Sequence, residues 1–293
     1  MQDIKIGTLI GPSDAKEKLK KLVDLGFESF SMTFWEKVGD NDLEAIAKDV
    51  VKTLEGTDCV VSSLSVFGNP LVDNDRGAQA RESWERCIDA AGKFGADLVT
   101  GFAGRIVDRP VNESIEAFAK VFSRLAKRAA DKNVRLAFEN CEMGGEWNKG
   151  DWNIAYSSKA WELMFEAVPD TNVGLQWEPC HQMVQLVDPI PQLRKWVKKV
   201  FCLHGKDATV AWDIIRERGI NCGEPYVWHR TPGFGDTNWS DIVTILRMNG
   251  FKGSIDIEGF HDPVYRGALE YTGQVRGLKY LKECRGGDFI PNP

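Results

Sequence analysis

Eight short apolar runs, spread along the whole chain, constrain its fold more than any other feature of the sequence. Each run is five to nine residues long, which is typical of a buried strand and short for a helix. Between the runs, the spacing of apolar residues changes to the 3.6-residue period of an amphipathic helix. The runs lie at residues 4–10, 27–34, 59–67, 96–102, 134–139, 173–178, 200–204 and 254–258.

The segment that follows Asn112 illustrates the helical pattern. Its apolar residues recur on one helix face, and Asn112 is predicted to cap this helix; they are Ile115, Phe118, Phe122, Leu125 and Ala129. Strands that alternate with helices, without a linker between them, predict a single (β/α)8 TIM barrel that forms one domain over residues 1–293. The alternative is an open doubly wound sheet, but no GxGxxG follows the first run.

Composition and charge exclude several classes of protein. With 43% apolar and 27% charged residues, the chain is predicted to fold rather than to be disordered. Its net charge of −6 argues against a nucleic-acid partner, which needs a basic surface. The start of the chain has no hydrophobic signal region, and no apolar run reaches the roughly 18 residues of a membrane span. Seven cysteines without a CxxC pair are typical of reduced thiols. We therefore expect a cytoplasmic protein without a membrane partner.

The last four runs end in ionisable residues that share one face. Alternate residues of a barrel strand face the interior, and functional groups project from the carboxyl ends of the strands. In run 134–139, for example, Phe138 faces the helices and Glu139 faces inward. Taking alternate residues in each of the last four runs gives four inward-facing residues at the strand ends: Glu139, Glu178, His204 and Glu258. The first four runs end near Thr8, Trp35, Asn69 and Phe102, and are predicted to supply walls.

Three carboxylates and an imidazole at one barrel mouth would repel one another without a cation among them. This mixed set of oxygen and nitrogen ligands predicts one divalent metal held by Glu139, Glu178, His204 and Glu258. The excess of carboxylates favours Mn²⁺, with Mg²⁺, Co²⁺ and Zn²⁺ as alternatives.

Several segments together resemble the xylose isomerase-like TIM barrel superfamily, which includes sugar-phosphate isomerases, ketose 3-epimerases, inosose dehydratases and endonuclease IV. The resemblance covers nearly the whole chain in register. The segments are SVFGNPL, LAFEN with Glu139, VGLQWEPCH with Glu178 and His181, FCLHGKD with His204 and Lys206, PGFGDTNW with Gly233, Gly235 and Trp239, and GSIDIEGFHD with Glu258.

The resemblance implies a reaction as well as a fold. In the epimerase branch, the matching positions bind one divalent metal, and the glutamates that match Glu139 and Glu258 also serve as acid and base. One position departs from the family pattern, because Glu178 stands where the family usually has the shorter aspartate. A metal that polarises a carbonyl allows a carboxylate to remove the neighbouring proton. Returning that proton to the other face epimerises the sugar, returning it to the other carbon isomerises it, and losing a β-substituent is an elimination.

Other polar residues are predicted to assist at the substrate oxygens. His181 is expected to take part in catalysis, and Lys206 and Arg230 to bind substrate, with a solvated loop position as the alternative for His181 and Arg230. Gly233 and Gly235 favour a tight turn over a phosphate cradle, since no Walker pattern is present.

The loop at residues 141–153 is long, rich in glycine, and carries Trp147 and Trp152. It is predicted either to cover the site as a lid or to lie anchored against the barrel. If both tryptophans bind substrate, the site is larger than a free ketose needs. This supports a second hypothesis, a lyase that expels the aglycone of a 3-keto-glycoside and resembles the catalytic subunit of C-glycoside deglycosidases.

The partners expected from the sequence are a sugar or glycoside substrate and further copies of the chain in a homo-oligomer, with a small accessory subunit under the lyase hypothesis. Two hypotheses from other classes fit less well. A nuclease like endonuclease IV would need a histidine-rich cluster of several metals and a basic groove, but the chain is acidic and has four histidines. A non-catalytic sugar-binding protein would not need both Glu139 and Glu258.

Overall fold

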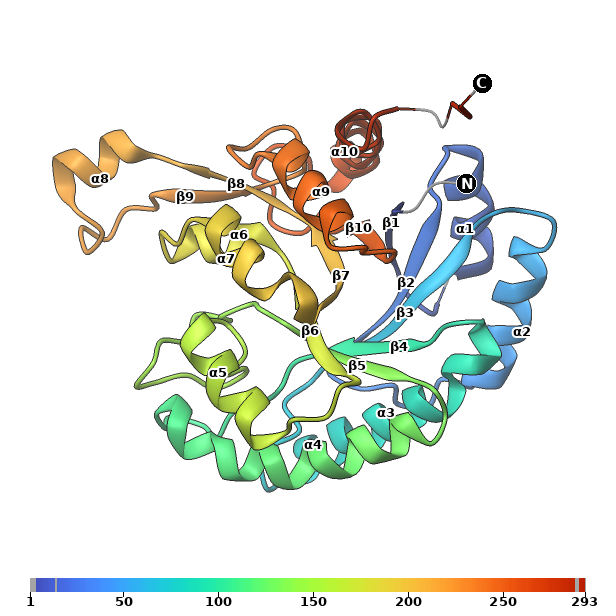
Figure 1. Ribbon diagram of the computed structural model, residues 1–293, viewed down its shortest axis with the longest axis horizontal. Coiled ribbons are helices and arrows are strands. Elements are labelled where there is room, and N and C mark those ends of the chain that lie inside the picture. Colours follow the sequence, from blue (N-terminus) through green and yellow to red (C-terminus); the bar gives the residue numbers. More distant parts are fainter. Residues whose placement is uncertain (1–3, 14, 288–289, 293) are drawn as a thin grey trace. The chain divides into compact units, whose positions relative to one another are not determined.

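The computed structural model describes residues 4–13, 15–287 and 290–292. All eight predicted strands form, and within these residues they follow the order of a closed parallel barrel, β1-β10-β7-β6-β5-β4-β3-β2 (Figure 1). The fold class predicted from the sequence is thereby confirmed. The barrel strands are β1 Lys5–Ile10, β2 Ser29–Trp35, β3 Val60–Phe67, β4 Leu98–Gly101, β5 Arg135–Glu139, β6 Val173–Trp177, β7 Val200–Gly205 and β10 Ser254–Ile257.

The chain divides into two compact units, and each is described by itself. The N-terminal unit comprises Leu9–Trp177 and Lys199–Cys202. The C-terminal unit comprises Met1–Thr8, Glu178–Lys198 and Leu203–Pro293.

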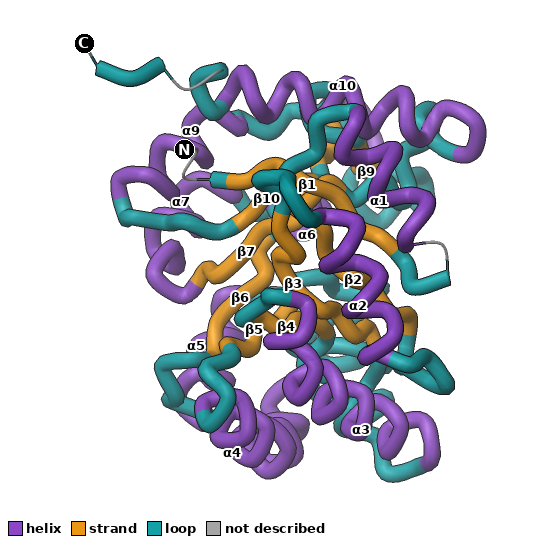
Figure 2. The backbone as a smooth tube through the Cα atoms, turned by 90° about the vertical axis from the view of Figure 1, so that its right-hand side faces the viewer, coloured by secondary structure: helices purple, strands orange, loops and turns teal. Residues whose placement is uncertain are grey.

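In the N-terminal unit, strands β2 to β6 pair in parallel, and the helices lie outside them (Figure 2). An aromatic core joins the helices to the sheet: Trp84, Phe118, Phe122 and Phe138 are fully buried, and the rings of Phe122 and Phe138 lie 4.7 Å apart. Losing one such side chain would cost about 3–5 kcal/mol. The helices are α1 Ala15–Asp24, α2 Leu43–Leu54, α3 Asp75–Ala90, α4 Ile115–Ala130 and α5 Ser158–Ala167.

The predicted helix after Asn112 is α4, and its apolar face is buried as expected. The prediction that Asn112 caps this helix is wrong. Asn112 lies inside a 3-10 turn, Val111–Ser114, and Ser114 takes the cap position without a side-chain hydrogen bond. The turn begins directly after Pro110, whose fixed φ of −54° suits the start of a helical turn.

The other face of the same sheet carries hydroxyl groups. Ser65 Oγ lies 2.8 Å from Ser31 Oγ and 2.6 Å from Thr100 Oγ1, which links β2, β3 and β4. All three side chains are buried, so these hydrogen bonds satisfy polar groups inside the barrel.

In the C-terminal unit, β10 pairs in parallel with β1 and with β7. The register sets Asp256 opposite His204, so side chains two residues further along β10 share the face of His204. The surrounding helices are α6 Pro179–Val184, α7 Pro189–Trp196, α9 Trp239–Met248 and α10 Glu270–Cys284.

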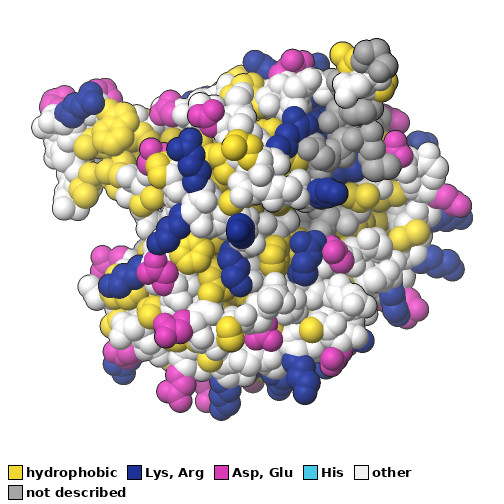
Figure 3. Space-filling view, in the orientation of Figure 1, with side chains coloured by type: hydrophobic (Ala, Val, Ile, Leu, Met, Phe, Trp, Pro, Cys, Tyr) yellow, Lys and Arg dark blue, Asp and Glu magenta, His cyan; other side chains and the backbone are white. Residues whose placement is uncertain are grey.

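A hairpin that the sequence patterns do not predict extends from the end of β7. Strands β8 (Asp207–Val210) and β9 (Val227–Arg230) are antiparallel, with helix α8 (Trp212–Arg218) at the tip (Figure 1). Hydrophobic side chains are exposed at this tip, among them Trp212 and Ile220 (Figure 3). The base of the hairpin is packed, because Ala208 joins Cys180 and Met183 of α6 in a buried cluster. No helix within the described ranges is long and apolar enough to cross a membrane.

Candidate metal centre

Three of the four predicted metal ligands lie together in the C-terminal unit. One ligand atom of each of Glu178, His204 and Glu258 lies within 4.8 Å of the others. His204 Nδ1 is 3.0 Å from Glu258 Oε2 and 3.5 Å from Glu178 Oε2. Glu178 and His204 are buried, and the Glu258 side chain is 13% exposed.

The local sequence explains how these side chains are presented. β6 ends at Trp177, Glu178 caps α6, and Pro179 occupies the first helical turn, where a missing N–H costs nothing. Glu258 comes directly after β10, two residues beyond Asp256, which pairs with His204. The two-residue period of the strands therefore brings Glu258 to the imidazole.

Two further predicted residues adjoin this cluster. His181 follows Glu178 by one helical turn, and its Nε2 pairs with Glu178 Oε1. Lys206 is buried, and its ammonium lies 2.7 Å from Glu258 Oε1. Burial alone would raise the pKa of Glu258, but Lys206 and His204 outweigh burial and hold that pKa well below its ordinary value. Glu258 is therefore a carboxylate at neutral pH.

The predicted tight turn at Gly233 and Gly235 folds against Asp207, a residue to which the sequence analysis gives no role. Asp207 is fully buried and accepts hydrogen bonds from the backbone N–H groups of Ala208 and Thr237 and from the Trp239 indole. Burial raises the pKa of Asp207, and these hydrogen bonds offset part of that rise. A side chain at Gly235 would lie 2.4 Å from Asp207 Oδ1, so this position requires glycine.

The hairpin adds one histidine that counting residues at the strand ends did not select, and it lies beside two others. His229 pairs with Ala208 across the hairpin, and its ring meets His181 at 5.3 Å and His261 at 5.6 Å. Burial lowers the pKa of His261, and the positive charge of Lys206 lowers it further. In the sequence, the adjacent residues His229 and Arg230 are the only hint that this segment reaches the site. Strands β8 and β9 have four residues each, which is too short to show an alternating pattern.

Arg230 is held in place by an aspartate. Its Nε lies 3.5 Å from Asp262 Oδ2, and Asp262 also accepts hydrogen bonds from the backbone N–H groups of Thr231, Val264 and Tyr265. Burial would raise the pKa of Asp262, but these hydrogen bonds and Arg230 together lower it.

The fourth predicted ligand, Glu139, belongs to the N-terminal unit. It is the last residue of β5, is buried, and pairs in register with Gln176 of β6. The amide of Asn153 donates to the backbone carbonyls of Glu139 and Cys141, which fixes the start of the loop that follows.

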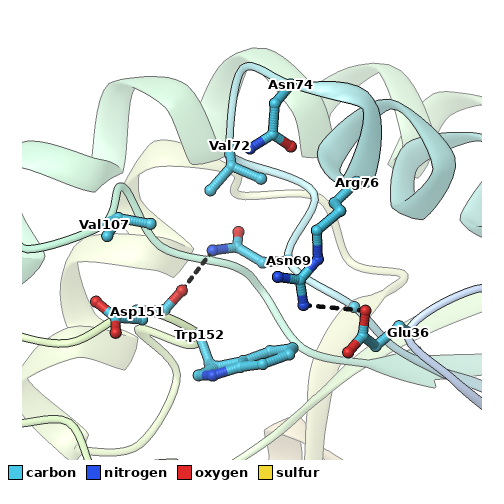
Figure 4. Close-up of a pocket in the computed structure, with 9 residues that line it drawn as sticks. Glu36, Asn69, Val72, Asn74, Arg76, Val107, Asp151 and Trp152 are labelled. Carbon is cyan, nitrogen blue, oxygen red and sulfur yellow. Dashed lines mark hydrogen bonds and ion pairs between the residues drawn. The ribbon is translucent and has the colours of Figure 1, made fainter.

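The same unit contains Trp147 and Trp152, and they have different surroundings. Lys159 Nζ lies 4.1 Å above the Trp147 ring, and the Trp147 carbonyl accepts a hydrogen bond from the fully buried Arg105. Trp152 instead lines a cavity at the carboxyl ends of β2 and β3 (Figure 4). Arg105 and Asn153 hold the loop at several carbonyls, as the anchored alternative predicts.

The donor set suits a divalent metal. Glu178 and Glu258 supply carboxylate oxygens and His204 an imidazole nitrogen, a combination that Mn²⁺, Mg²⁺, Co²⁺ and Zn²⁺ all accept. Glu178 and Glu258 also bring two carboxyl groups to one imidazole, and the ammonium of Lys206 is bonded to only one of them. A second group, Cys180, His181 and His229, brings ligand atoms within 4.8 Å and offers a sulfur donor, which favours Zn²⁺.

The sequence model of the xylose isomerase-like TIM barrel family matches residues 19–284, and the chain belongs to this family. Among curated proteins, an inosose dehydratase of Clostridium tetani is 24% identical over 187 residues, which cover 60% of this chain and 57% of the dehydratase. The aligned part thus spans little more than half of that relative. The Bacillus subtilis protein YfiH is 20% identical over 302 residues, covering 85% of this chain and 89% of YfiH.

Solved structures with the same fold include two epimerases. The 3-keto-D-glucoside 4-epimerase YcjR from E. coli is 16% identical, with a TM-score of 0.71 over 96% of this chain and 100% of YcjR. An L-ribulose 3-epimerase is also 16% identical, with a TM-score of 0.70 over 97% of this chain and 96% of the epimerase chain.

Proposed function

We propose that the chain is a divalent-metal-dependent sugar isomerase or epimerase that removes a proton beside the carbonyl of a keto-sugar. The observation that carries this proposal is the cluster of Glu178, His204 and Glu258, with Lys206 bonded to Glu258. Membership of a family with isomerases, epimerases and dehydratases supports it, as do the names of the two epimerases of like fold.

Glu139, Glu178, His204 and Glu258 are the proposed metal ligands. The case for Glu139 comes from register: it pairs with Gln176, and Glu178 lies two residues beyond Gln176 on the same face by the period of the strand. When bound, a divalent ion would polarise the substrate carbonyl and increase the acidity of the neighbouring C–H. Mn²⁺ is the first choice and Mg²⁺, Co²⁺ and Zn²⁺ the alternatives.

The protein's own groups would move the proton. Glu258 is suited to remove it because Lys206 keeps the carboxyl group ionised. Glu139 is proposed to return a proton from the other face of the sugar. Glu178 orients His181, which we expect to contact a substrate oxygen, and Arg230 is positioned by Asp262 for a hydroxyl group.

A carbon–oxygen or carbon–carbon lyase that acts on keto-sugars is the second candidate. The same proton abstraction leads to elimination when the neighbouring carbon carries a leaving group, and the match to inosose dehydratases favours this class specifically. In this hypothesis the leaving group is the aglycone of a 3-keto-glycoside. A small accessory subunit is then the expected partner.

Proton exchange with solvent tests the shared step. Wild-type protein with added Mn²⁺ should exchange a substrate C–H with D₂O for a free ketose or a 3-keto-glycoside, as followed by proton NMR. Interconversion of free ketoses without aglycone release would support the isomerase, and the reverse result would support the lyase. Absence of exchange with every keto-sugar and every one of the four metals would refute both.

Metal content is a separate prediction. We expect one divalent ion per chain, lost in Glu178→Ala and retained in Cys180→Ser, because Cys180 belongs only to the second donor group. Plasma mass spectrometry of dialysed protein measures this. Two ions per chain, or loss of the ion in Cys180→Ser, would contradict the assignment.

A further inference from the structure

A cavity of about 270 Å³ opens in the N-terminal unit, at the carboxyl ends of β2 and β3 (Figure 4). This is the end of the strands at which barrel enzymes bind their substrates, and Glu139 ends β5 at the same side. The volume is just below the roughly 300–1,000 Å³ of pockets for drug-sized ligands, so it suits one ring. The lining residues are Glu36, Gly68, Asn69, Val72, Asn74, Arg76, Val107, Asp151 and Trp152.

The walls of this cavity are already held in place. The Asn69 amide donates to the carbonyls of Arg105 and Asp151, at 2.7 Å each, and its oxygen accepts from the N–H groups of Leu71 and Arg105. Three loops are thereby joined at one side chain. Since binding would not need to order these loops, little affinity would be lost to conformational entropy.

One tryptophan lines the cavity, and a second lies beside it. Trp152 lines it directly, and Trp35, at the end of β2, lies 6.0 Å from Trp152 between ring centroids, with the planes tilted by 34°. Trp35 is 60% exposed, so its indole can be reached from solvent. The electron-rich face of an indole attracts the weakly positive C–H groups on the flat side of a sugar ring.

The charges at the cavity favour a neutral occupant. Arg76 Nη2 lies 3.0 Å from Glu36 Oε2, so the one cation among the described residues that line the cavity is already paired, and Asp151 adds a further negative charge. An anion such as a sugar phosphate would be repelled. The guanidinium and the carboxylate can still donate to and accept from neighbouring hydroxyl groups.

The backbone at Glu36 has a conformation that L-residues avoid, with φ at +59°. Gly68 makes this conformation possible, because a side chain there would lie 2.2 Å from the Glu36 carbonyl oxygen. The chain thus keeps Glu36 at the rim of the cavity in a strained backbone conformation, and such strain concentrates at ligand sites.

We infer that this cavity is a subsite for a neutral sugar ring, namely the non-reacting ring of a glycoside substrate. The inference rests on the proposed function and narrows its substrate class to neutral keto-glycosides over sugar phosphates. The cavity has room for one such ring beside Trp152, over whose ring the Arg76 guanidinium carbon lies 5.5 Å from the centroid, with the hydroxyl groups of the sugar toward Glu36 and Arg76.

Indole N–H signals in two-dimensional NMR test the subsite directly. The probes are methyl β-D-glucoside, which is neutral, and glucose 6-phosphate. Trp35→Ala and Trp152→Ala assign the two signals by their absence. Methyl glucoside should shift both signals, leave the signal of Trp212 on helix α8 of the C-terminal unit unmoved, and bind at least about tenfold more weakly to Trp152→Ala than to Trp212→Ala. Glucose 6-phosphate should leave both signals in place.

A second variant guards against misfolding of Trp152→Ala. Arg76→Gln removes the partner of Glu36 and keeps both indoles, and it should weaken glucoside binding at least about threefold. Equal glucoside affinity in Trp152→Ala, Arg76→Gln and Trp212→Ala, or a preference for the phosphate, would overturn the subsite. Failure of the proposed function is a different observation, since it would appear as no solvent exchange by wild type with any keto-sugar while the glucoside shifts persist.

Discussion

Glu258 is the residue on which the proposed chemistry depends most. Glu258→Gln keeps the shape of the side chain and removes its ability to take a proton. Glu258 follows β10 outside the apolar core, and the glutamine amide oxygen can still accept a hydrogen bond from the buried Lys206, so the variant should fold normally. Solvent exchange should fall at least about a hundredfold, the lower end of general acid–base contributions. Glu116→Gln, on an exposed helical position, is the matched control and should retain full activity. A large drop in thermal midpoint in Glu258→Gln would contradict this role.

Asp262 makes stability depend on pH in a defined direction. Its pKa is lower in the folded chain, so its contribution to stability is present above about pH 4, the pKa of an unfolded aspartate, and is lost as the pH falls further. Asp262→Asn loses the acceptor for Thr231 N–H and should destabilise the protein by about 1–3 kcal/mol at pH 7. Thermal midpoints measured from pH 7 to pH 3 should show the difference from wild type shrinking below about pH 4. A difference that is constant over this range would refute the prediction.

At the scale of elements, the turn after β9 depends on a close approach between Gly235 and Asp207. Gly235→Ala would place a Cβ within 2.5 Å of both Asp207 Oδ1 and the Ala208 carbonyl oxygen. We expect a loss of about 1–3 kcal/mol in the free energy of unfolding, measured with urea. Gly92→Ala is the control, because nothing lies within 4 Å of its added Cβ and the backbone there is ordinary. It should be neutral or slightly stabilising, and equal effects of the two substitutions would argue against the close packing at Gly235.

At the scale of the whole molecule, the single domain predicted from the sequence remains a prediction. Each compact unit contains only part of the barrel strands, and β1 and β7 contribute residues to both units. A part of a sheet leaves unpaired edges, so we expect neither unit to be stable alone and the chain to unfold in one cooperative transition. Calorimetry and tryptophan fluorescence should give the same midpoint, and two separate transitions would contradict a single domain. The expected homo-oligomer also remains a prediction, which sedimentation equilibrium tests.

The alternation of strand and helix patterns was sufficient to predict the barrel and the position of every barrel strand, because both periods come from local backbone geometry. The same counting selected Glu178, His204 and Glu258, since parallel strands with a two-residue period carry their end residues to one side.

Other features depend on contacts between distant segments. The hairpin β8–β9 brings His229 to His181, Asp207 organises the turn at Gly235, and Trp35 and Trp152 meet from strands and loops more than a hundred residues apart. Short strands and irregular loops carry no period in the sequence. Their arrangement is decided by hydrogen bonds and packing that exist only once the chain has folded.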